Sequence, residues 1–169
     1  MSFLRGTSLT VIALCVAAAA TPRSAAAQRP LLGLVPTTQL PDSDFKNLRW
    51  VEGTWRGDAV GTKEPPFFER YTFLDDSLIQ VTFYSDSTLR HEIGSGRIYH
   101  NGGRVFEEAG SARWVAVKMQ PGEALFIPDR NAPNRVRWQL NGPDQWMVTI
   151  RSSMSGTERI RMYQMHRIH

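Results

Sequence analysis

Cysteine is nearly absent from this chain of 169 residues, whose one cysteine is Cys15, close to the start. A disulfide framework and a cysteine-ligated metal site both need several cysteines, so the sequence excludes both. The folded part must then be stabilised by its hydrophobic core. A chain of this length can bury most of the surface that its unfolded form exposes, and one domain is expected.

Long runs of like charge are also missing, although basic residues outnumber acidic ones by 20 to 16. The densest basic stretches are R-V-R at 135–137 and R-I-R at 159–161. In both, the arginines alternate with an apolar residue, which is typical of the solvated face of a half-buried strand. The charge pattern therefore predicts no nucleic-acid partner.

Familiar catalytic motifs are absent as well, because the chain has neither a G-x-S-x-G elbow nor an H-E-x-x-H metal motif. Its four histidines, His91, His100, His166 and His169, are scattered. We therefore assign no catalytic residue and expect no metal and no cofactor. One enzymatic hypothesis stays open, in which His91, His100 and Glu69 converge from neighbouring strands as an acid–base or metal site.

The first residues are typical of a secretory signal peptide. Arg5 precedes an unbroken small and apolar run from Leu9 to Ala20, and Ala25–Ala27 offers an A-x-A cleavage site. As a helix this run would span about 18 Å, too short for a hydrocarbon core of about 30 Å. We expect residues 1–27 to be cleaved, leaving an exported protein, periplasmic or secreted, with no membrane span.

Cleavage would remove Arg5 and Arg23 from the 20 basic residues and none of the 16 acidic ones, which leaves a net charge of +2. It would also remove the cysteine. Cleavage after Ala20, or lipid attachment at Cys15, are the alternatives.

An arm and a short helix are expected next. Residues 28–44 contain three prolines and little periodicity, which is typical of an extended arm or linker. Within residues 42–53, an acidic or serine cap, apolar Phe45 and Leu48 at helical spacing and a final Gly53 predict a short helix. The folded domain is expected to cover residues 45–169.

From Gly53 onward the apolar residues recur with a period of two, and turn residues interrupt the pattern about every ten residues. The predicted strands are 54–60, 67–74, 78–84, 89–100, 104–108, 112–119, 123–127, 134–140, 145–152 and 157–168. The short connections require antiparallel neighbours. We predict an all-β, antiparallel up-and-down barrel of about 8–10 strands, because closure removes the exposed edges; a two-sheet sandwich is the alternative.

Alternation within these strands indicates which side chains point inward. Trp146, Val148 and Ile150 share one face, as do Val136, Trp138 and Leu140, and Ile79, Val81 and Phe83. Glu69 shares a face with Tyr71 and Phe73, which would place a carboxylate beside an aromatic wall. In the last strand either Ile160 and Met162 or Tyr163 and Met165 could face inward. The candidate ligand-binding residues are Tyr71, Phe73, Phe83, Trp138 and Trp146.

Gly53-Thr54-Trp55, placed after a short helix and at the start of the first strand, resembles the G-x-W signature of the lipocalin and wider calycin group. The resemblance implies that Trp55 closes the base of the barrel and that an arginine of the last strand packs over it. Arg161 or Arg167 is the expected partner, ahead of Arg159. Gly53, Trp55, Arg161 and Arg167 are therefore the candidate structural motif.

The stretch G-T-W-R-G is similar to the first strand of nitrobindin-type haem barrels, and R-H-E-I-G-S-G-R at 90–97 loosely resembles their H-x-E-x-G segment. That family's haem-ligating histidine stands about seven residues before a terminal arginine, where this chain has Ile160. Haem is therefore not expected. The L-x-W-x-x-G-T-W start also resembles that of uncharacterised exported bacterial domains, which implies a fold and no activity.

These observations favour an exported barrel that binds a small apolar or amphipathic molecule. A structural or interaction protein of the cell envelope with a filled core is the second hypothesis, and a barrel enzyme with His and Glu as acid–base residues is the third. The sequence leaves the oligomeric state and the identity of the ligand open.

Overall fold

A computed structural model describes residues 39–40, 42–154 and 156–169. The expected signal peptide, residues 1–27, and most of the expected arm lie outside the described residues. No helix in the described part of the chain is both long enough and apolar enough to span a membrane.

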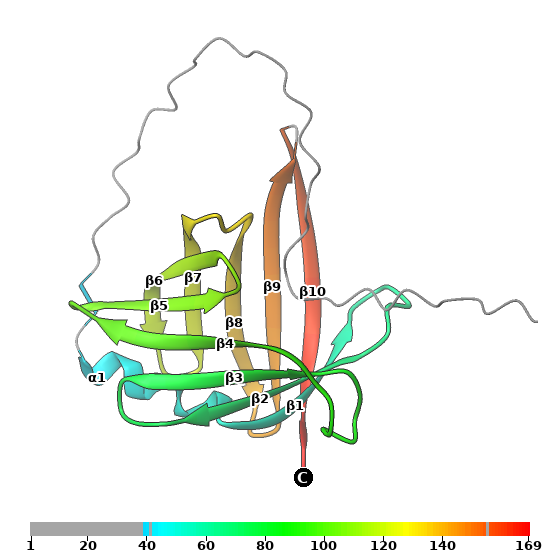
Figure 1. The fold of residues 1–169 in the computed structure, drawn as a ribbon. Coiled ribbons are helices and arrows are strands. Elements are labelled where there is room, and N and C mark those ends of the chain that lie inside the picture. The colour runs from blue at the N-terminus through cyan, green and yellow to red at the C-terminus, as the bar shows by residue number, and fades with distance from the viewer. Residues whose placement is uncertain (1–38, 41, 155) are drawn as a thin grey trace, which may run out of the picture.

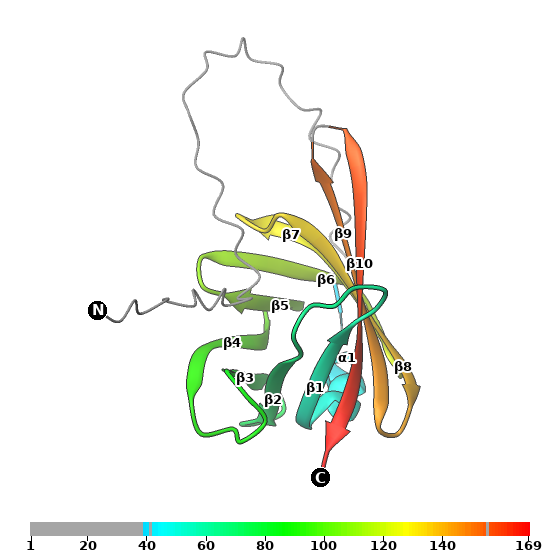
Figure 2. The same cartoon turned by 90° about the vertical axis from the view of Figure 1, so that its right-hand side faces the viewer.

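Ten antiparallel strands close into a barrel, which confirms the predicted fold class (Figures 1 and 2). Each strand pairs with its neighbours in sequence, and β1 closes the ring by pairing with β10. The strands are β1 (Gly53–Ala59), β2 (Phe67–Phe73), β3 (Leu78–Tyr84), β4 (Glu92–Asn101), β5 (Arg104–Ala109), β6 (Ala112–Gln120), β7 (Glu123–Arg130), β8 (Asn134–Gly142), β9 (Gln145–Met154) and β10 (Thr157–Ile168).

The period-two pattern located every strand, and the bounds of β3 and β10 match the prediction. Two bounds differ by three residues: β7 ends at Arg130 and not at 127, and β4 begins at Glu92 and not at 89. The preceding loop continues further than the pattern indicated: Leu89 has a φ of 57°, and the backbone of Ser85 donates a hydrogen bond to the carbonyl of His91. A left-handed residue interrupts the extended backbone that a strand needs.

The turn between β4 and β5 shows how the sequence closes a hairpin. Asn101 pairs with Arg104, so the loop between them consists of Gly102 and Gly103. Their φ angles are 58° and 72°. Two successive positive φ angles are what a two-residue hairpin turn of the type I′ class requires, and glycine adopts them without a steric penalty.

The short helix expected from the sequence is present, and it plugs one end of the barrel. It consists of α1 (Asp42–Phe45) followed by the 3-10 helix η1 (Lys46–Val51), near the foot of the barrel in Figure 1. Leu48 and Val51 are fully buried there, together with Trp55 and Trp146. This end of the barrel is therefore a packed core.

The structure also settles which face of the last strand points inward. Tyr163 and Met165 are buried, whereas Ile160 and Met162 are 49% and 41% exposed. Strand β1 pairs with β10 only from Tyr163 onward, so the beginning of β10 has just β9 beside it. This part of the β9–β10 hairpin projects beyond the other strands (Figures 1 and 2).

Candidate functional site

Above the helical plug the barrel is hollow. The cavity has a volume of about 70 Å³, counted as the space that the centre of a water molecule can occupy, and it is partly open to solvent. Tyr71 and Trp138 form the boundary between this cavity and the packed end. Both line the cavity, and both contact Trp146 below it, at ring-centroid distances of 5.9 and 5.2 Å.

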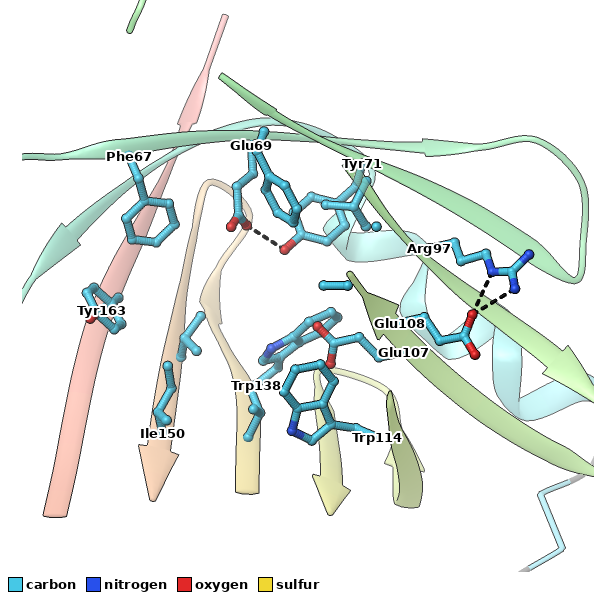
Figure 3. A pocket seen from close by; sticks show the side chains of 16 residues that line it. Phe67, Glu69, Tyr71, Arg97, Glu107, Glu108, Trp114, Trp138, Ile150 and Tyr163 are labelled. Carbon is cyan, nitrogen blue, oxygen red and sulfur yellow. Dashed lines mark hydrogen bonds and ion pairs between the residues drawn. The ribbon is translucent and has the colours of Figure 1, made fainter. Parts of the chain in front are cut away.

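The cavity walls are mostly aromatic and aliphatic. They come from both halves of the barrel, because β2 to β6 and β8 to β10 all contribute lining residues. Phe67, Trp114, Ile150 and Tyr163 lie around the space (Figure 3). Phe83 and Val148 also line it. Trp114 donates its indole N–H to the backbone oxygen of Asn134, over 3.0 Å, so this tryptophan has no free donor for the cavity.

Two carboxyl groups enter this apolar space, Glu69 from β2 and Glu107 from β5 (Figure 3). Glu69 accepts a hydrogen bond of 2.7 Å from the hydroxyl of Tyr71. Burial raises the pKa of Glu69 to about 7, and the hydrogen bond from Tyr71 opposes part of that rise. The pKa of Tyr71 itself is raised well above its ordinary value, first by burial and then by the charge of Glu69.

Glu107 is the more unusual of the two, because its Oε2 atom is inaccessible to solvent and has no hydrogen-bond partner among the described residues. Burial raises the pKa of Glu107 to about 8, and the nearby charge of Glu69 adds to the rise. Buried carboxyl groups without a partner are rare because their ionised form loses its hydration. At neutral pH the pair therefore holds at least one proton.

The next residue in sequence shows what a paired carboxylate looks like in the same strand. Glu108 faces the other side of β5, where Arg97 donates to it over 2.7 Å and the hydroxyl of Tyr99 donates over 2.9 Å. Although burial acts to raise it, these partners hold the pKa of Glu108 below its ordinary value. The contrast indicates that Glu107 lacks such partners because of where it points, and not because cations are scarce nearby.

The candidate ligand-binding residues fall into two groups. Tyr71, Phe83 and Trp138 line the cavity. Phe73 and Trp146 belong to the packed end: Phe73 meets Phe45 of α1 at a ring-centroid distance of 6.0 Å, and Trp146 is fully buried against the other tryptophans. The two groups differ in height along the barrel, which alternation alone does not reveal.

The histidine cluster considered from the sequence does not form. Glu69 lines the cavity, whereas His91 and His100 do not, and His100 lies with its Nε2 3.3 Å from the carbonyl oxygen of Leu40. Among the described residues, no group of three or more metal-ligating side chains lies close enough together to hold a metal ion.

The G-x-W segment lies at the base of the barrel, away from the cavity. The guanidinium of Arg167 is stacked over the ring of Trp55, 4.1 Å from its centroid. Arg161 is exposed and lies earlier in β10, where it pairs with Ile150 of β9. Of the two arginines preferred from the sequence, Arg167 is the one in contact with Trp55.

Sequence reasoning singled out Glu69 and missed Glu107. The signal for Glu107 was its two-residue spacing from Val105 and Ala109 in R-V-F-E-E-A. Phe106 obscures this signal. It lies on the opposite face of the strand from Glu107, and a large aromatic residue is usually expected on the inward face. Phe106 in fact lies outside the barrel wall, stacked on Tyr99 at 5.4 Å.

Comparison with known proteins gives a fold resemblance and no family. No family model matches the chain, and no curated protein matches it. Among solved structures, a redesigned β-barrel is similar, with 10% identity over 71% of this chain and 93% of its own, at a TM-score of 0.36. EF1p2_mFAP2b bound to DFHBI is similar at 8% identity over 73% of this chain and 98% of its own, with a TM-score of 0.37.

Proposed function

We propose that this protein binds a small, largely apolar molecule inside its barrel. The observation that carries the proposal is the cavity, which has aromatic and aliphatic walls and two buried carboxyl groups in them. Apolar walls with a few inward-pointing polar groups are typical of ligand pockets. A barrel that needed only stability would gain more from a filled interior and from apolar residues at positions 69 and 107. The cavity thus argues against the envelope protein with a filled core.

The dimensions restrict the ligand. A volume of 70 Å³ is about half of the ~150 Å³ of an engineered apolar cavity that holds benzene. A compact molecule with one substituted ring would therefore fill the enclosed space and reach into its open side. A larger molecule would extend through the open side of the cavity.

A cavity-filling substitution tests the proposal. Val148 lines the cavity, so we expect Val148→Phe to fill it, whereas Val60→Phe makes the same change at an exposed position. Ligand-detected NMR with a set of single-ring compounds should show binding to the native protein and to Val60→Phe, and none to Val148→Phe. Equal binding to both variants would place the ligand outside the barrel, and absence of binding throughout would refute the proposal.

Proton transfer on a bound molecule is a second candidate function, favoured by Glu69 and Glu107. Their pKa values of about 7 and about 8 lie in the range that suits a general base and a general acid near neutral pH. Acetophenone is compact and has exchangeable protons beside its carbonyl. In D₂O the native protein should deuterate it above the buffer rate, and Glu69→Gln should abolish the excess. Exchange at the buffer rate in both would remove this candidate.

We also propose that the protein acts outside the cytoplasm. The support is the signal-peptide pattern of residues 1–27. N-terminal sequencing of the protein purified from a bacterial periplasm tests this: a mature chain that begins at Gln28 is expected. An intact chain retained in the cytoplasm would contradict it.

A further inference from the structure

The carboxyl groups of Glu69 and Glu107 share one property that sets them apart from other carboxylates of the barrel wall. Glu108, Glu123 and Asp129 each pair with at least one arginine or lysine. Among the described residues, no lysine or arginine forms an ion pair with Glu69 or Glu107. Among the described residues, the one hydrogen bond to either carboxyl group comes from the hydroxyl of Tyr71, which donates to Glu69.

We propose that Glu69 and Glu107 together form a cation site, and that the molecule bound in the barrel carries a compact cationic nitrogen, such as a protonated amine. This inference rests on the proposed binding function and adds the chemical class of the ligand. An ammonium group between the two carboxyl groups would supply the cationic partner that both of them lack among the described residues.

The surrounding rings fit the same ligand. Tyr71, Trp114 and Trp138 line the cavity with the two carboxyl groups (Figure 3). Since aromatic faces attract cations, and more strongly where water is excluded, these walls would stabilise a cationic nitrogen as well as an apolar ring.

No cationic side chain in the described lining is free to pair with Glu69 or Glu107 in place of a ligand. The other ionisable side chains there are Arg97 on β4, Glu108 on β5 and Tyr163 on β10, besides Tyr71 on β2. Arg97 is bound to Glu108 on the outer side of the wall. The pKa of Tyr163 is raised, mainly by burial, so its hydroxyl stays neutral. Two charged side chains act on it, Arg161 and Glu64, and the hydroxyl donates to Glu64 over 3.5 Å. Strands β3, β6, β8 and β9 contribute no ionisable group to the described lining.

Binding of a cation should then be coupled to loss of a proton. Because the two carboxyl groups hold at least one proton near pH 7, a bound ammonium would favour their ionised form and displace it. The affinity for a cationic ligand should rise between pH 5.5 and pH 8. A neutral ligand of the same shape should show no such rise, since it gains nothing from ionising either group.

Benzylamine and benzyl alcohol are the matched probes, because they have the same ring and differ in the charge of one group. Isothermal titration at pH 7, in two buffers of different ionisation enthalpy, gives the affinity and the protons released. We expect benzylamine to bind about tenfold more tightly than benzyl alcohol, with release of roughly one proton. In Glu69→Gln/Glu107→Gln the preference and the proton release should both disappear, while binding of benzyl alcohol persists and shows that the variant is folded.

The outcomes separate this inference from the function on which it rests. If benzyl alcohol binds as tightly as benzylamine, or if amine binding releases no proton, the cation site is wrong and the binding function stands. If neither probe binds but other single-ring compounds do, the cation site is again wrong and the binding function again stands. If no compound binds and the Val148→Phe variant behaves like the native protein, both proposals fail.

Discussion

The guanidinium of Arg167 covers the ring of Trp55 and at the same time fastens the helical plug to the barrel. It donates hydrogen bonds to the carbonyl oxygens of Glu52, over 2.7 Å, and Trp50, over 3.3 Å. Trp55 in turn donates its indole N–H to the carbonyl of Val51, over 2.6 Å. Strand β10, strand β1 and η1 therefore meet through these two side chains, and the cavity lies above the base that they hold together.

Trp55→Ala should lower the free energy of unfolding by about 3–5 kcal/mol, because it leaves a large void in the packed end and frees the carbonyl of Val51. Urea denaturation of the native and variant proteins measures the loss. Trp55→Phe keeps a ring beneath Arg167, so its free energy of unfolding should fall by less than that of the alanine variant. A loss below about 1 kcal/mol for the alanine variant would mean that Trp55 does not close the base.

Gly53→Ala should also destabilise the protein, by about 1–3 kcal/mol. The φ of Gly53 is 121°, and a Cβ there would lie against Nη1 of Arg167. Arg167 could move away only by giving up its bonds to the plug. Gly142→Ala is the matched control, because nothing lies within 4 Å of the added Cβ, and its loss should stay within about 0.5 kcal/mol. Thermal unfolding of both variants makes the comparison; equal midpoints would contradict the close approach of Arg167.

The fold followed almost completely from local features. Few topologies are open to ten strands that alternate regularly and are joined by connections too short for a crossover helix. Turn residues such as Gly102 and Gly103 mark where the strands end. Closure of β1 on β10 is a long-range pairing, yet it could be predicted because an open sheet of this size would expose two edges.

The site could be predicted only in part, since alternation gives the side of the wall and not the height along the barrel axis. It placed Glu69 beside Tyr71 on the inner face, as the structure shows. It did not distinguish Trp138, at the cavity, from Trp146, in the packed end. Both glutamates are polar residues at inward positions, where local rules favour apolar ones, and such exceptions are expected at functional sites.

The protein should form no stoichiometric haem complex. Ile160 occupies the position of the histidine ligand in the haem barrels that the first strand resembles. Its side chain is 49% exposed on the projecting part of β10, outside the barrel. Titration with haemin should therefore give no Soret band that saturates at one equivalent. A saturating band would require a different ligand, and the test would then be repeated with His166→Ala and His100→Ala.

Glu107 should make the protein less stable as the pH rises. Below pH 4.5, its ordinary pKa, the carboxyl group is protonated in the folded and the unfolded chain alike, so it contributes no pH dependence. Between pH 4.5 and about 8 the unfolded chain releases a proton that the folded chain keeps, and each step upward in pH favours unfolding. Above about pH 8 the full penalty is present.

Glu107→Gln removes this titration and keeps the size of the side chain. The stability of the variant relative to the native protein should therefore increase by about 4–5 kcal/mol between pH 4 and pH 9. Urea denaturation at pH 4, 6 and 9 measures the free energy of unfolding of both proteins. Carboxylates with lowered pKa values, such as Asp86 and Glu108, have the opposite pH dependence, but they are present in both proteins and cancel in the difference. Glu92→Gln makes the same change at an exposed position outside the cavity and is the matched control. If the stability difference for Glu107→Gln is the same at all three pH values, Glu107 ionises as it does in water, and the carboxyl group does not lie in the apolar cavity.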